Sequence, residues 1–182
     1  RFLDSSGDAV GTSGVLPAAN PHALAAFRLS LLTGMRKSEI TGDLKREIPG
    51  LKWENVDLDA GTLRLLLHKT SRKVGARTVI LCRAALEMLD TLPQILGNPY
   101  VIPGEKAGEA LERLQPVWVR VRETVRLLQE KAMVPKKDQV SVADVTIHDL
   151  RRSFASLAAR MGYGELFVAT LLGHKAGSVT AG

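Results

Sequence analysis

The chain has 182 residues, of which 45% are hydrophobic, and this length suits one globular domain with a hydrophobic core. Lysine and arginine number 25 against 19 aspartate and glutamate residues, which gives a formal net charge of +6. Such a balance favours a polyanionic partner, either nucleic acid or an anionic membrane surface. A single cysteine, Cys82, excludes an internal disulfide bond and a cysteine metal cluster, and we expect it to be a small buried residue.

The hydropathy pattern argues against membrane insertion and secretion. No apolar run reaches the roughly 20 residues that a membrane-spanning helix needs, and no charged segment followed by an apolar one opens the chain. We therefore expect a soluble, cytoplasmic protein. The chain begins at Arg1 rather than at methionine and stops at Gly182, which suggests a piece of a longer protein.

Two helices are predicted near the start of the chain, after a loop. Asn20 followed by Pro21 is a helix-start signal, because asparagine caps a helix and proline fits its first turn. Apolar residues then recur on one face, which predicts a helix over residues 21–33. A second helical segment is expected over residues 35–40, and residues 41–50 are expected to be a loop or a helix that carries an insertion.

A β-hairpin is predicted next. Apolar residues alternate with polar ones over residues 63–67 and again over 77–81, which is the pattern of two half-buried strands. The turn between them contains Lys69, Arg72 and Lys73. Taken alone, this basic tip fits a solvated turn and a contact with a phosphate backbone equally well.

The rest of the chain is predicted to be mostly helical. Helices are expected over residues 83–92, 116–133, 147–161 and 165–172, with a polar connector over 136–143 and a possible short strand over 100–102. The predicted fold class is therefore α+β, mostly helical with a small antiparallel sheet.

Three short segments combine charged or titratable residues at helical spacing. Arg36 and Glu39 lie three residues apart, close enough to pair on one face of a helix, and His148 and Arg151 share the same spacing. Gly173 is expected to end the last helix and to leave His174 exposed behind it. Each segment alone has an ordinary structural explanation, such as a surface ion pair or a histidine at a helix start.

Together, the segments resemble the catalytic domain of the tyrosine recombinases of the phage-integrase type, from about residue 21 onwards. The family's motifs correspond here to Thr33-Gly34-Met35-Arg36 with Glu39, to Lys69 on the hairpin, to His148-x-x-Arg151 and to Leu172-Gly173-His174. The resemblance implies one α+β catalytic domain over residues 1–182, with a core-binding domain before it and a nucleophile segment after it missing. The stretch 41–50 is longer than the family's usual link.

The resemblance also implies roles for individual residues. Guanidinium groups can hold the non-bridging oxygens of a phosphodiester under attack, a lysine can protonate the leaving 5′-oxygen, and histidines can donate hydrogen bonds to the same phosphate. The catalytic residues implied are Arg36, Lys69, His148, Arg151 and His174, with Glu39 in support, and the DNA-contacting residues implied are Arg72, Lys73, Arg77 and Arg152. No metal or other cofactor is expected.

The expected reaction is site-specific recombination of duplex DNA through a 3′-phosphotyrosyl intermediate, carried out by several protomers, a tetramer on DNA. The family's nucleophilic tyrosine would fall just after Gly182, and neither Tyr100 nor Tyr163 occupies that place. The 182-residue chain is therefore expected to be inactive and monomeric by itself. Two alternatives remain open, DNA relaxation of the type IB topoisomerase kind and a recombinase-like DNA-binding module without catalysis.

Overall fold

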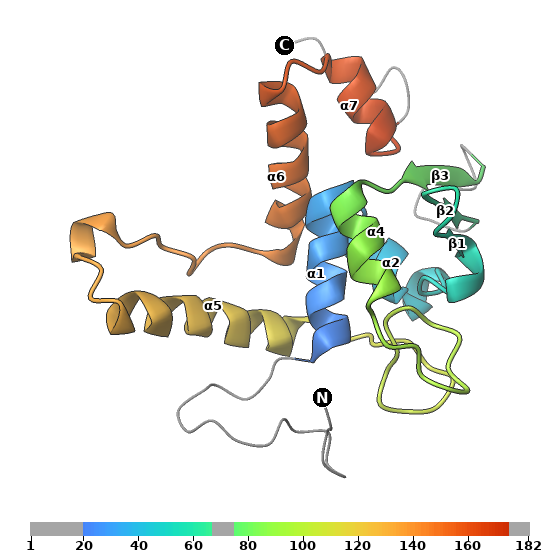
Figure 1. Ribbon diagram of the computed structural model, residues 1–182, viewed down its shortest axis with the longest axis horizontal. Coiled ribbons are helices and arrows are strands. Elements are labelled where there is room, and N and C mark those ends of the chain that lie inside the picture. Colours follow the sequence, from blue (N-terminus) through green and yellow to red (C-terminus); the bar gives the residue numbers. More distant parts are fainter. Residues whose placement is uncertain (1–19, 67–74, 175–182) are drawn as a thin grey trace.

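The computed structural model describes residues 20–66 and 75–174, and helices are the main regular structure in this part (Figure 1). One three-stranded antiparallel sheet lies at one side of the helices. The α-helices are α1 (Pro21–Thr33), α2 (Lys37–Thr41), α4 (Arg83–Asp90), α5 (Gln115–Lys131), α6 (Ile147–Arg160) and α7 (Glu165–Leu171). The predicted class, a mostly helical α+β fold, is confirmed. No helix among the described residues is long and apolar enough to cross a membrane.

Helix α1 is the centre of the fold and packs against α2, α4 and α6. The side chain of Asn20 accepts hydrogen bonds from the backbone N–H groups of His22 and Ala23, so the predicted cap is confirmed. Ala23 and Leu29 are fully buried although they lie on different faces of α1, because neighbours cover the helix on several sides. Gly34 ends the helix in the left-handed conformation and donates its N–H to the carbonyl of Ser30.

The sheet has the order β1 (Val56–Asp57), β2 (Thr62–Leu65), β3 (Arg77–Ile80). Leu63 pairs with Val79 across β2 and β3, and both side chains are buried in the main core. The predicted hairpin is therefore confirmed at its base. Its tip, with Lys69, Arg72 and Lys73, lies outside the described residues.

Three local predictions need correction or refinement. Cys82 is exposed rather than buried, because it is the N-cap of α4 and comes after the buried Leu81. Residues 100–102 form an isolated bridge from Tyr100 to Lys52 instead of a strand. The stretch 41–50 is a tight loop that holds the 3-10 helix η1 (Leu44–Arg46) and is closed by a bridge between Asp43 and Ile48.

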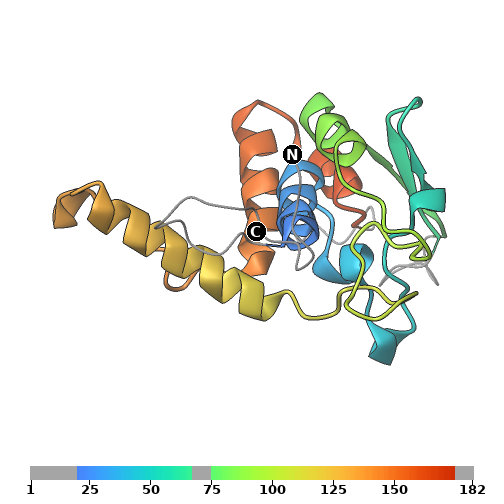
Figure 2. The same ribbon diagram turned by 60° about the horizontal axis from the view of Figure 1, so that its bottom comes forward.

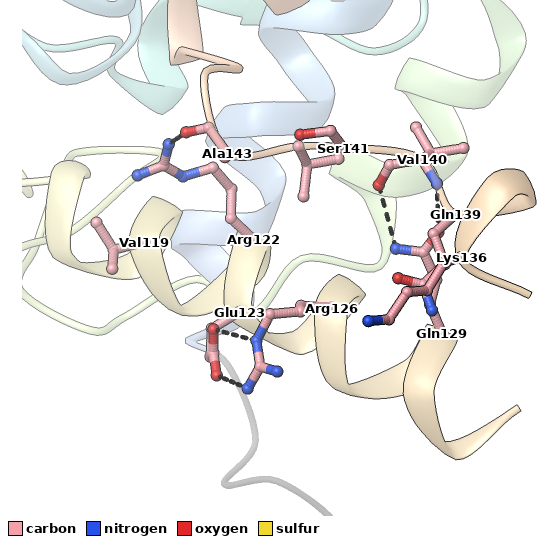
Figure 3. A pocket seen from close by; sticks show the side chains of 11 residues that line it. Val119, Arg122, Glu123, Arg126, Gln129, Lys136, Gln139, Val140, Ser141 and Ala143 are labelled. Carbon is pink, nitrogen blue, oxygen red and sulfur yellow. Dashed lines mark hydrogen bonds and ion pairs between the residues drawn. The ribbon is translucent and has the colours of Figure 1, made fainter. Parts of the chain in front are cut away.

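Helix α5 projects away from the other helices, and the chain returns beside it through the 3-10 helix η3 (Lys136–Asp138) to α6 (Figures 1 and 2). Side chains of α5 hold the returning segment: the Gln129 side-chain amide exchanges hydrogen bonds with the backbone of Val140, and Arg122 donates to the carbonyl of Ala143 (Figure 3). At the base of α5, Trp118 donates to the carbonyl of Val145 at 2.8 Å.

Gly34 also provides a test of how closely α1, α6 and α7 pack. A Cβ atom there would lie 2.6 Å from Phe154 and 2.7 Å from Leu172, at a φ of +67°. Gly34→Ala is therefore expected to destabilise the fold by about 2–5 kcal/mol, from backbone strain and overpacking together. Gly97→Ala is the matched control, because Gly97 has a φ of +80° with nothing within 4 Å of the added atom. Urea unfolding measures both, and equal losses would contradict the close packing.

Candidate functional site

Glu39 is the centre of a buried ion-pair cluster. Arg36 is the N-cap of α2, and its backbone N–H and its Nη1 each donate to one carboxylate oxygen of Glu39 at 2.8 Å. The Glu39 side chain is fully buried, while 17% of the Arg36 side chain is exposed. The predicted ion pair is therefore confirmed, but its carboxylate lies inside the protein rather than on a solvated helix face.

Arg77 reaches the same carboxylate from the sheet. Its Nη2 donates to Oε2 of Glu39 at 3.2 Å, and its Nη1 donates to the carbonyl of Leu171, the last residue of α7, at 3.3 Å. Burial, opposed by Glu39, lowers the pKa of Arg77. Glu39 thus accepts hydrogen bonds from Arg36 at the start of α2 and from Arg77 on β3. Because Arg77 also donates to the carbonyl of Leu171, it links α2 and β3 to the end of α7.

Arg151 approaches from α6, in the second turn of the helix, and is 4% exposed. Its Nη1 donates to the carbonyl of Gly34, and its Nη2 donates to the carbonyl of Leu172 at 2.7 Å. Burial, together with the neighbouring charge of Arg36, lowers the pKa of Arg151 to about 10. The guanidinium is therefore still positively charged at neutral pH.

His174 follows the turn that ends α7. Gly173, at a φ of +66°, makes this turn, and a Cβ atom at Gly173 would lie 2.5 Å from Nη1 of Arg77. Nε2 of His174 lies 3.3 Å from Nη2 of Arg151. Burial, followed by the positive charge of Arg151, lowers the pKa of His174, so its ring is neutral at neutral pH and keeps one N–H donor.

His148 stands at the edge of the cluster, in the first turn of α6. Partial burial, followed by the charges of Arg152 and Arg151, lowers its pKa. It lines a surface groove together with Arg36, which connects it to the cluster. Arg152 is exposed and pairs with Asp149 at 2.9 Å.

The structure thus brings together residues from four distant segments of the chain. Arg36, Arg151 and His174 meet around Glu39 and Arg77, with His148 beside them, whereas Lys69 lies outside the described residues. Three arginines face one carboxylate, so the cluster carries an excess of positive charge and suits an anionic ligand. Within residues 20–66 and 75–174, no group of three or more metal-ligating side chains was found.

On sequence grounds Arg77 was assigned only a contact with DNA, and its place inside the cluster was not foreseen. A signal was present in the alternation of the strand, because Arg77 lies on the same face of β3 as the buried Val79. Its predicted contact with DNA stays a prediction.

Comparisons with known proteins point to one family. The sequence model described as "Phage integrase family" matches residues 16–182. Prophage integrase IntF of Escherichia coli strain K12 is 26% identical over 162 residues, which cover 86% of this chain and 29% of that protein. The chain therefore spans less than a third of the length of this relative.

Solved structures show the same fold. The Tn1549 transposon integrase, solved in complex with transposon right end DNA, has a TM-score of 0.56 and 15% identity, over 84% of this chain and 51% of that one. XerA recombinase has a TM-score of 0.53 and 21% identity, over 89% of this chain and 58% of that one. The integrase from mycobacterium phage Brujita has a TM-score of 0.53 and 20% identity, over 85% and 44% of the two chains. These likenesses show the fold, and the family match over residues 16–182 shows that the chain belongs to the phage integrase family of tyrosine recombinases.

Proposed function

We propose that this chain is the catalytic domain of a site-specific recombinase, which cuts and rejoins duplex DNA through a 3′-phosphotyrosyl intermediate. The observation that carries the proposal is the meeting of Arg36, Arg151 and His174 in one positively charged site, from α2, α6 and the end of α7. A phosphodiester under attack gains negative charge on its non-bridging oxygens, and this arrangement supplies donors for those oxygens.

Each residue has a distinct part in the proposed reaction. Arg36 and Arg151 hold the non-bridging oxygens; Arg151 gives two of its N–H donors to carbonyls and has further donors for a ligand. His174 and His148 donate hydrogen bonds to the same phosphate. Glu39 fixes the guanidinium of Arg36 and takes no proton.

The covalent step needs a nucleophile and a general acid. We place the nucleophile at a tyrosine that follows Gly182 in the full-length protein, so the 182-residue chain alone is inactive. The tyrosine oxygen bonds to phosphorus as its proton passes to the neutral ring of His148, the bond from phosphorus to the 5′-oxygen breaks, and Lys69 gives its proton to that oxygen. The phosphotyrosyl bond keeps the strand activated, so a 5′-hydroxyl can rejoin it by the reverse steps.

The proposed partners are duplex DNA and further protomers of the same protein, assembled as a tetramer on DNA, in the cytoplasm. Arg72, Lys73 and Arg152 are proposed to contact DNA phosphates, in addition to Arg77. The relative from Tn1549 was solved with DNA, which supports the choice of ligand. No metal or other cofactor enters the proposed reaction, because arginines supply the positive charge.

The test uses the full-length protein and a suicide substrate, a duplex nicked close to the cleavage position and taken from the ends of the element that encodes the protein. We expect a covalent protein–DNA adduct, visible as a slower band on a denaturing gel. Changing the first tyrosine after Gly182 to phenylalanine should abolish it. An adduct formed equally by both proteins would overturn the assignment of the nucleophile. Relaxation of plasmids without any target site would favour a topoisomerase, and absence of both activities would favour a DNA-binding module.

A further inference from the structure

A groove of about 750 Å³ begins beside the candidate site and runs towards the loop 41–50. Arg36 and His148 line its end nearest the arginine cluster, and the loop and Arg113 line the rest. The groove is therefore continuous with the place where the scissile phosphate is proposed to bind. We call it the loop groove; its lining side chains with positive charge are Arg36, Lys37, Lys45, Arg46 and Arg113.

The charges of the loop groove favour an anionic occupant. Only two carboxylates, Asp43 and Glu112, line the groove beside these cations, and Asp43 is paired with Arg46 at 2.9 Å. Within the described residues, neither Lys45 nor Arg113 makes an ion pair, and both side chains are exposed. Their charges are thus available to a ligand.

The lining also argues against a docked peptide. Peptides usually anchor apolar side chains in a hydrophobic pocket. Leu44 is the one apolar side chain among the lining residues, and it is 80% exposed, so it forms no pocket. A polyphosphate chain needs no such anchor, because charge and hydrogen bonds to its oxygens suffice.

We propose that the loop groove binds the phosphates that adjoin the scissile phosphate on the same DNA strand, and that Lys45 and Arg113 contact them. This inference rests on the proposed function. Each strand of a duplex presents a phosphate roughly every 3.4 Å along the helix axis, so a strand held at Arg36 continues directly over the neighbouring surface. The loop 41–50 thereby lengthens the phosphate-binding surface of the catalytic site.

The test compares the salt dependence of DNA binding by the full-length protein and by Lys45→Ala/Arg113→Ala, with a fluorescent duplex of random sequence. Each lost phosphate contact reduces the slope of log K against log salt concentration by about 0.9, so the double variant should lose about two units of slope. Lys45→Arg/Arg113→Lys keeps both charges and should keep the slope. Lys136→Ala/Lys137→Ala removes two charges from η3, at the far end of α5, and serves as the control for net charge.

An unchanged slope in Lys45→Ala/Arg113→Ala would overturn the inference, because neither side chain would then contact a DNA phosphate. An equal reduction in the η3 control would also overturn it, because the effect would then come from net charge alone. The adduct assay separates this inference from the proposed function: adduct formation with an unchanged slope refutes only the loop groove, whereas absence of the adduct refutes the proposed reaction.

Discussion

Replacing Arg151 by alanine is expected to lower covalent-adduct formation by the full-length protein by about 10²–10³-fold, since a donor to the developing charge is lost. Arg151 is buried and charged, and its Nη2 lies beside His174, so water cannot readily replace its guanidinium. Single-turnover cleavage of a suicide substrate measures the effect. Arg160→Ala is the matched control, because Arg160 is an exposed arginine in the last turn of the same helix, α6, away from the cluster.

Because Arg151 also makes structural hydrogen bonds, a second variant is needed to separate the loss of catalysis from the loss of stability. Arg151→Ala removes hydrogen bonds to the carbonyls of Gly34 and Leu172, which lowers stability as well as activity. Arg36→Ala leaves those bonds in place and should reduce cleavage to a similar extent. Thermal unfolding monitors the fold of each variant. Cleavage within tenfold of the unsubstituted protein, in variants that remain folded, would remove both arginines from the proposed reaction.

Much of the local structure follows from the sequence because the signals are short-range. The Asn20–Pro21 pair marks the start of α1, and the alternation in 63–67 and 77–81 marks β2 and β3. These patterns reflect capping and burial on one face, which depend on neighbours a few residues away. The interpretation of Cys82 as a buried residue was wrong. Cys82 is the N-cap of α4, and the turn that starts this helix, rather than the hydrophobicity of the side chain, determines its exposure.

The site itself could not be derived from local patterns. Arg36 and Arg151 belong to α2 and α6, and their meeting depends on how α6 packs on α1 and on where Gly34 ends that helix. Only the resemblance to a family indicated that these residues meet. The burial of Glu39 was not foreseen either, because a surface ion pair has the same sequence spacing as a buried one.

Glu39→Gln is expected to cause the largest loss of stability among single substitutions at the site. The carboxylate is buried and accepts from Arg36 and Arg77, with Arg151 close by, so its removal leaves several buried cations without a counter-charge. Breaking a buried ion pair by changing one partner typically costs about 3–5 kcal/mol. Glutamine has the same shape, but its amide group adds N–H donors that must face guanidinium donors.

Urea unfolding of Glu39→Gln, Arg77→Ala and the double variant tests this expectation as a double-mutant cycle. Because Arg77 and Glu39 share one ion pair, the double variant should lose less free energy of unfolding than the sum of the two single losses. Glu87→Gln is the control, since it breaks the exposed Arg83–Glu87 pair and should leave the unfolding midpoint almost unchanged. If Glu39→Gln were as stable as the unsubstituted protein, or if the losses simply added, the buried carboxylate would not be what holds the arginines in place.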